Sequence, residues 1–168
     1  LSSSLKVFAL LGLSGLSACG FTPLYGHAGD ASVAGRLDLV RVGNIPDRPG
    51  QMLRLALESS LHAAGRPVAE DYVLNVSYGI AQSAIGIEAD TSSTRTRFTG
   101  TAGFTLAPIG DPQRILDQGS VTAEDALNVI DQQYFASTLE TDTVNQQLAD
   151  EISAQITEQL AAYFKTQP

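Results

Sequence analysis

The sequence predicts an α+β fold, a two-layer sandwich in which two helices cover one face of a four-stranded, mostly antiparallel sheet. Three observations predict it. Apolar residues alternate with polar ones over residues 72–80, and a second alternating run covers residues 94–106. Near the C-terminus, apolar residues recur at every fourth position. The expected order is β-α-β-β-β-α, because two amphipathic helices bury their stripes best against one shared sheet face.

The first strand and the first helix are expected in residues 33–62. Residues 33–42 mix β-branched residues with leucines, which favours a strand. Residues 44–50 (NIPDRPG) interrupt the chain, and Asp47 is the expected N-cap of a helix that Gly65 and Pro67 end. One face of this helix carries Leu53, Ala56, Leu57, Ser60 and Leu61. This face should pack on the sheet.

Three further strands are expected in the middle of the chain. In residues 72–80 the inward positions are Tyr72, Leu74, Val76, Tyr78 and Ile80. A polar bridge, residues 82–93, leads to the run 94–106, which directs Phe98, Ala102, Phe104 and Leu106 inward and Arg95, Arg97, Thr99, Thr101 and Thr105 outward. A weaker fourth strand is expected from Arg114 to about Val121, with an extension towards Asn128. The threonine and arginine side of the sheet should stay exposed.

A long helix is expected to close the chain. Ser137 and Glu140 fit the capping box S-x-x-E at its start. Its apolar row is Val144, Leu148, Ile152, Ile156, Leu160 and Phe164. About 27 residues of helix would span roughly 40 Å.

The N-terminal segment is typical of a secretory signal peptide. Residues 1–18 contain one positive charge, Lys6, then an apolar run and small residues. Residues 16–19 (LSAC) resemble the lipobox of bacterial lipoproteins, which implies that Cys19 carries the lipid after cleavage at Ala18. The alternative is a buried N-terminal helix in which Cys19 only packs. Because Gly20 is not the aspartate that retains such lipoproteins at the inner membrane, the resemblance implies the outer membrane, on its periplasmic side.

Composition limits the function classes. The net charge is −8, and removing Lys6 with the signal peptide makes it −9, which argues against nucleic acid as a partner. The remaining chain of about 150 residues suits one domain. Cys19 is the only cysteine, so no disulfide and no cysteine-based metal site is expected. His27 and His62 are expected to be surface or packing residues, and no cofactor is expected.

With these features in view, the chain resembles the LPS-assembly lipoprotein family LptE, in its alphaproteobacterial form. The resemblance rests on residues 19–26 (CGFTPLYG) after the lipobox, on the expected element order, and on residues 133–137 (QYFAS) before the long helix. It implies a lipoprotein that is not an enzyme and that forms a one-to-one complex with the outer-membrane barrel LptD, which it plugs and helps to assemble. The implied division is a signal peptide (1–18), an acylated leader (19–32) and one LptE-like domain (33–168).

Two alternatives stay open at this point. Arg95 and Arg97 lie on one side of a strand and suit contact with the phosphates of lipopolysaccharide, or they form a solvated face paired with Glu88 or Asp90. The protein is the LptD plug, or it is a periplasmic auxiliary lipoprotein of another envelope machine, such as a lipid-transport ABC system. No arrangement of nucleophile, base and carboxylate is evident, and ordinary surface charge is expected for Asp38, Asp117, Glu124 and Asp125.

Overall fold

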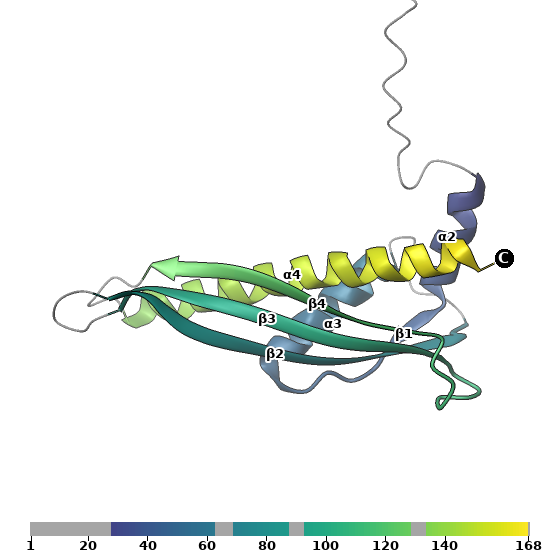
Figure 1. Cartoon of the computed structure of the whole chain (residues 1–168), viewed down its shortest axis with the longest axis horizontal. Helices are drawn as coiled ribbons and strands as arrows, with labels where there is room; N and C mark the ends of the chain where they lie inside the picture. The colour runs from purple at the N-terminus through teal and green to yellow at the C-terminus, as the bar shows by residue number, and fades with distance from the viewer. Residues whose placement is uncertain (1–27, 63–68, 88–92, 129–133, 168) are drawn as a thin grey trace, which may run out of the picture. The chain divides into compact units, whose positions relative to one another are not determined.

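The computed structural model describes residues 28–62, 69–87, 93–128 and 134–167 (Figure 1). The chain divides into two compact units, Leu1–Ala31 and Ser32–Pro168, and the sheet belongs to the second. The elements are α2 (Ala28–Asp38), β1 (Val40–Val42), α3 (Asp47–Leu61), β2 (Tyr72–Ile87), β3 (Ser93–Pro108), β4 (Asp117–Asn128) and α4 (Tyr134–Thr166). The expected signal peptide, Cys19 and His27 lie outside the described residues.

The four strands form one mixed sheet in the order β1-β2-β3-β4. β1 runs parallel to β2, because α3 crosses over between them, whereas β2, β3 and β4 form an antiparallel meander. The predicted α+β sandwich with a mostly antiparallel sheet is therefore confirmed. The long ladders align residue 72 of β2 with Pro108 of β3, and Leu106 of β3 with Asp117 of β4.

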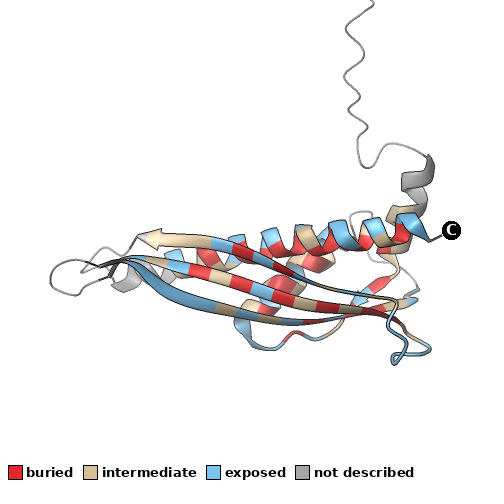
Figure 2. Ribbon diagram, in the orientation of Figure 1, coloured by how far each residue is buried: buried red, intermediate tan, exposed pale blue. Residues whose placement is uncertain are grey.

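The core lies between the sheet and the two helices α3 and α4 (Figure 2). The predicted row of α4 is buried along its whole length, and Ile152, Ile156 and Leu160 are fully buried. The inward residues of β2 and β3 meet this row, as the alternation predicted. α3 buries Gly50, Leu53, Leu57 and Leu61, whereas Ser60 of the predicted face stays exposed.

Two adjoining rows on α4 face different neighbours. A side chain at Gly100 of β3 would come within 3.0 Å of Ile152 Cδ1, so the Ile152 row lies on the sheet. The next residue, Ser153, is buried and its hydroxyl lies 2.9 Å from that of Ser60 on α3. α4 thus packs against β3, β4 and α3, and other central positions, among them Ala154 and Glu158, are exposed.

The first predicted strand is mostly wrong. Residues 33–38 continue the helix α2, and only residues 40–42 form a strand. Val33 and Leu37 are four residues apart, and both pack on the core, so a helix buries them together. Helix α2 also begins at Ala28, inside the predicted acylated leader of residues 19–32.

The predicted helix caps are wrong at both helices. Pro46, not Asp47, is the N-cap of α3, and no side chain caps it. Asp47 is the first helical residue and has φ 66°, a left-handed conformation that aspartate tolerates better than most residues. α4 begins at Tyr134, so Ser137 lies inside the helix. α3 ends at Leu61, and Gly65 and Pro67 lie outside the described residues.

The strand boundaries also differ from those predicted. β2 continues to Ile87 and β3 begins at Ser93, so most of the expected bridge 82–93 is strand. β4 begins at Asp117 and covers the extension to Asn128. Backbone pairing with β3 extends β2 and β4 through residues 82–87 and 122–128, where small, polar and apolar residues are mixed without the clear alternation of residues 72–80.

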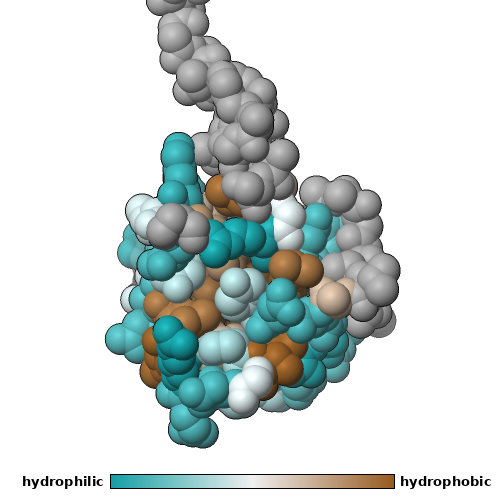
Figure 3. Space-filling view, turned by 90° about the vertical axis from the view of Figure 1, so that its right-hand side faces the viewer, coloured by the Kyte–Doolittle hydropathy of each residue, from teal (hydrophilic) through white to brown (hydrophobic). Residues whose placement is uncertain are grey.

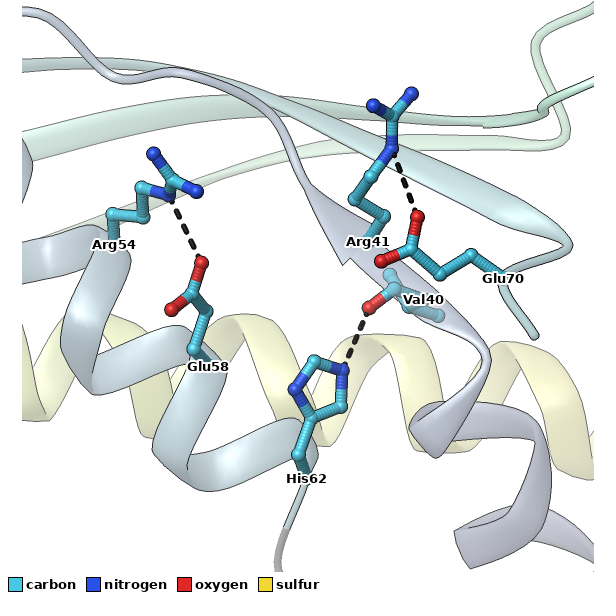
Figure 4. A network of polar contacts seen from close by, with 6 residues as sticks. All are labelled: Val40, Arg41, Arg54, Glu58, His62 and Glu70. Atoms are coloured by element: carbon cyan, nitrogen blue, oxygen red, sulfur yellow. Dashed lines mark hydrogen bonds and ion pairs between the residues drawn. The ribbon is translucent and has the colours of Figure 1, made fainter. Parts of the chain in front are cut away.

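Three polar contacts lie around β1 and α3 (Figure 4). His62, after α3, lies with Nε2 3.0 Å from the Val40 carbonyl of β1, so the expectation of a packing histidine is confirmed. Arg41 pairs with Glu70 at 3.4 Å, and Arg54 pairs with Glu58 within α3 at 3.0 Å. The first two contacts join β1 to segments distant in sequence, and the third lies within one turn of α3; exposed ion pairs of this kind contribute little to stability.

Helix α2 is held at the C-terminal end of α4. The Arg36 guanidinium donates to the carbonyl oxygens of Phe164 and Gln167, at 3.2 and 2.7 Å, and lies 5.4 Å from the Phe164 ring centroid. A cation here satisfies carbonyls that the helix leaves unpaired.

Seen from the right-hand side of Figure 1, hydrophobic groups are interspersed among hydrophilic ones and do not form one continuous patch (Figure 3).

Candidate functional site: the open face of the sheet

The sheet face that α3 and α4 leave uncovered is the most distinctive surface of the described residues, and we call it the open face. Side chains alternate along each strand, so the odd-numbered residues of β2 and β3 and the even-numbered residues of β4 point to it. Its central members are Asn75, Ser77, Gly79, Ala81, Thr99, Thr101, Gly103, Thr105, Gln118, Ser120, Thr122 and Glu124. Hydroxyl, amide and glycine residues dominate it, and the threonines of β3 lie on it as the alternation of residues 94–106 predicted.

A shallow hollow of about 680 Å³ lies on this face, near the end of the sheet where β2 and β4 begin. Gly103 is its centre, because the cross-strand row Ser77–Gly103–Ser120 has no side chain in the middle strand. Ser77 Oγ donates to the Gly103 carbonyl at 3.3 Å. The neighbouring row adds Asn75, Thr105 and Gln118 to the rim. All these groups are neutral, and they offer both donors and acceptors.

The charged end of the open face contains the two predicted arginines. The structure places Arg95 and Arg97 on the same side of β3, as expected, and both are exposed. Arg97 Nε lies 3.9 Å from Glu124 Oε2, and Thr99 Oγ1 lies 3.5 Å from Glu124 Oε1. Arg97 therefore pairs with Glu124, whereas Glu88 and Asp90 lie outside the described residues. An exposed ion pair at this distance contributes little to stability, but the Glu124 carboxylate offsets the positive charge of Arg97.

The other predicted carboxylates have local roles. Asp117 Oδ1 accepts from the Gln118 amide at 3.0 Å, and Asp125 Oδ1 accepts from the Ala126 amide at 2.7 Å. In the part of the chain that the structure describes, no three His, Cys, Asp or Glu residues lie together as metal ligands would. Among the same residues, no helix has the length and hydropathy to cross a membrane.

Two features of the site region escaped sequence reasoning. Glycine within a threonine-rich strand was a signal for the hollow at Gly103, since glycine in a strand often marks a close approach of another group. The second feature is Tyr78, which points to the covered side of β2. Its hydroxyl is buried with no hydrogen-bond partner among the described residues, and burial raises the pKa of Tyr78 to about 12. Only the packing of Tyr78 beside Gly100 could reveal this.

Solved structures with the same fold carry lipoprotein names. One assigned as a lipoprotein of Caulobacter crescentus CB15 shares 18% identity and a TM-score of 0.66, over 82% of this chain and 98% of that one. A minor lipoprotein from Acinetobacter baumannii shares 18% identity and a TM-score of 0.59, over 73% and 90%. Rare lipoprotein B from Shewanella oneidensis shares 10% identity and a TM-score of 0.55, over 73% and 92%.

These similarities establish the fold, which extends over nearly the whole of each matched structure. No protein-family model matches the chain, and no curated protein matches it.

Proposed function

We propose that this chain is a lipid-anchored envelope lipoprotein of the LptE type, which docks its open face inside the LptD barrel during lipopolysaccharide transport to the cell surface. Three independent features support the proposal: the lipobox before Cys19, the resemblance of residues 19–26 to that family, and the fold shared with lipoproteins. The role is structural and not enzymatic.

The chemistry of the open face is the observation that carries this proposal. Large membrane barrels have polar interiors, so a protein that fills one needs many hydrogen-bonding groups and few exposed apolar ones. The open face has this composition over three strands, and its neutral hollow at Gly103 can receive a polar side chain of the partner. A net charge of −9 after removal of residues 1–18 disfavours lipopolysaccharide as the main ligand, because that lipid is anionic.

Co-purification from detergent-solubilised outer membrane tests the proposal. Thr101 is exposed near the centre of the open face, so Thr101→Arg should lower recovery of a one-to-one LptD complex without unfolding the domain. The matched control is Ala154→Arg, which adds the same side chain to the exposed surface of α4 and should leave recovery unchanged. Recovery of ABC-transporter components in place of the barrel, or equal recovery with both variants, would contradict the proposal.

The anchor has its own test. Metabolic labelling with a tagged fatty acid should mark the parent chain and not Cys19→Ala, because the thiol is the expected attachment point. Equal labelling of the two proteins would remove the lipoprotein assignment while leaving the barrel test intact.

A further inference from the structure

The edge of the sheet formed by β2 is unpaired over most of its length. β1 pairs only with residues 72–74, although β2 continues to Ile87. Among the described residues, no other backbone hydrogen bond reaches the outer side of β2 after Leu74. In Figure 1, β2 forms the border of the sheet on the side opposite β4. A long unpaired strand edge is a ready template for another strand.

The backbone groups available along this edge follow from the β1 contact. The Leu74 carbonyl accepts from the Gly43 amide at 2.8 Å, so Leu74 directs its polar groups away from β3. The backbone N–H and C=O groups of successive residues point to opposite sides of a strand. Tyr78, Ile80 and Gln82 therefore also present these groups to the free side. Residues 81–85 are exposed at both faces of the strand, and Ile85 is 43% exposed. Nothing among the described residues covers this stretch.

The usual protections of a strand edge are missing from β2 until its end. None of its residues, 72–87, is charged. The register shifts only between Ala84 and Ile87, so residues 78–83 form a regular stretch. The opposite edge differs, since β4 carries Asp117, Glu124 and Asp125. Charges and bulges are what normally stop edges from pairing, and β2 has only the terminal bulge.

We propose that β2 pairs antiparallel with β2 of a second copy of this chain, joining two four-stranded sheets across a twofold axis at residues 78–83. In such a pair each residue near the axis faces its own counterpart or a close neighbour, so any charge there would meet a like charge. A strand without charges meets that condition, whereas the acidic β4 edge does not. The proposal concerns the chain outside any complex and does not depend on the function proposed above.

The expected dimer is weak. The paired stretch is short, and each chain without residues 1–18 carries a net charge of −9, so the copies repel at a distance. The gain comes from the backbone bonds of Tyr78, Ile80 and Gln82 and from covering the half-buried side chain of Ile80. Added salt should strengthen the dimer, because salt screens the long-range repulsion between the two chains and has little effect on the uncharged paired strands.

Sedimentation of the chain from Gly20 onward, which keeps every described residue, tests the proposal. The parent should form a concentration-dependent dimer between micromolar and millimolar protein. The double variant Ala81→Lys, Ser83→Lys should weaken it by at least about tenfold, because the new charges meet their counterparts in the paired stretch. The matched control Ser120→Lys, Thr122→Lys places the same charges on the open-face side of β4 and should leave the dimer within about twofold. Both variants lower the net negative charge equally, so general repulsion cannot explain a difference.

Amide hydrogen exchange provides a second measurement. Raising the protein concentration should slow exchange at Tyr78, Ile80 and Gln82, and not at amides of β4. A parent that stays monomeric at all concentrations, a dimer equally strong with the β2 lysines, or concentration-dependent protection along β4 would each overturn the proposal.

Discussion

The covered face and the open face of the sheet are formed by the same strands, yet their side chains lie in opposite environments. On the covered side, Leu74, Phe104 and Leu106 are buried under α3 and α4. On the open side their immediate neighbours Asn75 and Thr105 reach solvent. At these positions a shift of one residue decides whether a side chain stabilises the domain or is available to a partner, whereas Val73 and Ala107, at the end of the open face, are also buried.

Glycines show the same contrast at the level of single atoms. A Cβ at Gly119 would lie 2.6 Å from Gln159 Oε1 of α4 and 2.8 Å from the Phe104 ring, whereas a Cβ at Gly79 on the open face would meet nothing within 4 Å. Gly119 is thus required mainly by the Phe104 ring of the neighbouring strand, because the exposed Gln159 side chain can move aside. Gly79 is not required by packing.

The largest expected effect is a charge placed in the covered layer. Ile152→Asp puts a carboxylate in a fully buried position of α4 and should cost several kcal/mol, comparable with the whole free energy of unfolding, about 5–15 kcal/mol. Thermal unfolding followed by circular dichroism should lose its cooperative transition. Ala154→Asp, on the exposed side of the same helix, should keep it. A cooperative melt for Ile152→Asp would mean that α4 does not form the core.

Paired glycine substitutions should separate the faces next. Gly119→Ala should destabilise by about 1–3 kcal/mol, because Phe104 and Gln159 must move to admit a methyl group. Gly79→Ala should be neutral or stabilise by up to about 1 kcal/mol, since it restricts the unfolded chain without a clash. Denaturant unfolding measures both. An equal loss of unfolding free energy in Gly119→Ala and Gly79→Ala would contradict the expected difference between the two faces.

A smaller effect concerns Tyr78 and pH. Burial raises the pKa of Tyr78 to about 12 from 10.0, so the folded protein holds the neutral phenol where the unfolded chain releases the proton. Stability from this group is therefore complete below pH 10 and is lost as pH rises towards 12. Tyr78→Phe should remove that part of the alkaline loss. Because the hydroxyl has no described partner, the variant should be as stable as the parent at neutral pH. If the free energy of unfolding fell equally with rising pH in the parent and in Tyr78→Phe, ionisation of Tyr78 would not be the cause of the alkaline loss.

The smallest expected effect lies at the charged end of the open face. Arg95→Gln with Arg97→Gln should change the free energy of unfolding by no more than about 1 kcal/mol, because these side chains are exposed and the Arg97–Glu124 pair is long. Barrel association, which rests on a wider surface, should survive. A loss of lipopolysaccharide binding and of its salt dependence in this variant would instead assign the arginines to lipid phosphate.

Sequence reasoning worked where one period was strong. The four-residue repeat of α4 and the alternation of β2 and β3 reported directly which side chains are buried, because burial of one face imposes those periods. It failed for residues 33–38, where Val33 and Leu37 provide too few apolar positions to separate a helix from a strand. It failed again for the caps, since Pro46 and Asp47 take conformations that their surroundings impose.

The sequence by itself thus determined the fold class, the faces of β2, β3 and α4, and the threonine and arginine character of the open face; the lipobox at Cys19 stays a prediction. These are local properties, each carried by residues that are close in the chain. Only the tertiary structure decided that β1 is three residues long, that Arg97 meets Glu124, that Gly103 opens a hollow and that β2 ends the sheet unpaired. Each of these depends on strands brought together from distant positions, and no short stretch of sequence specifies which partner a strand will have.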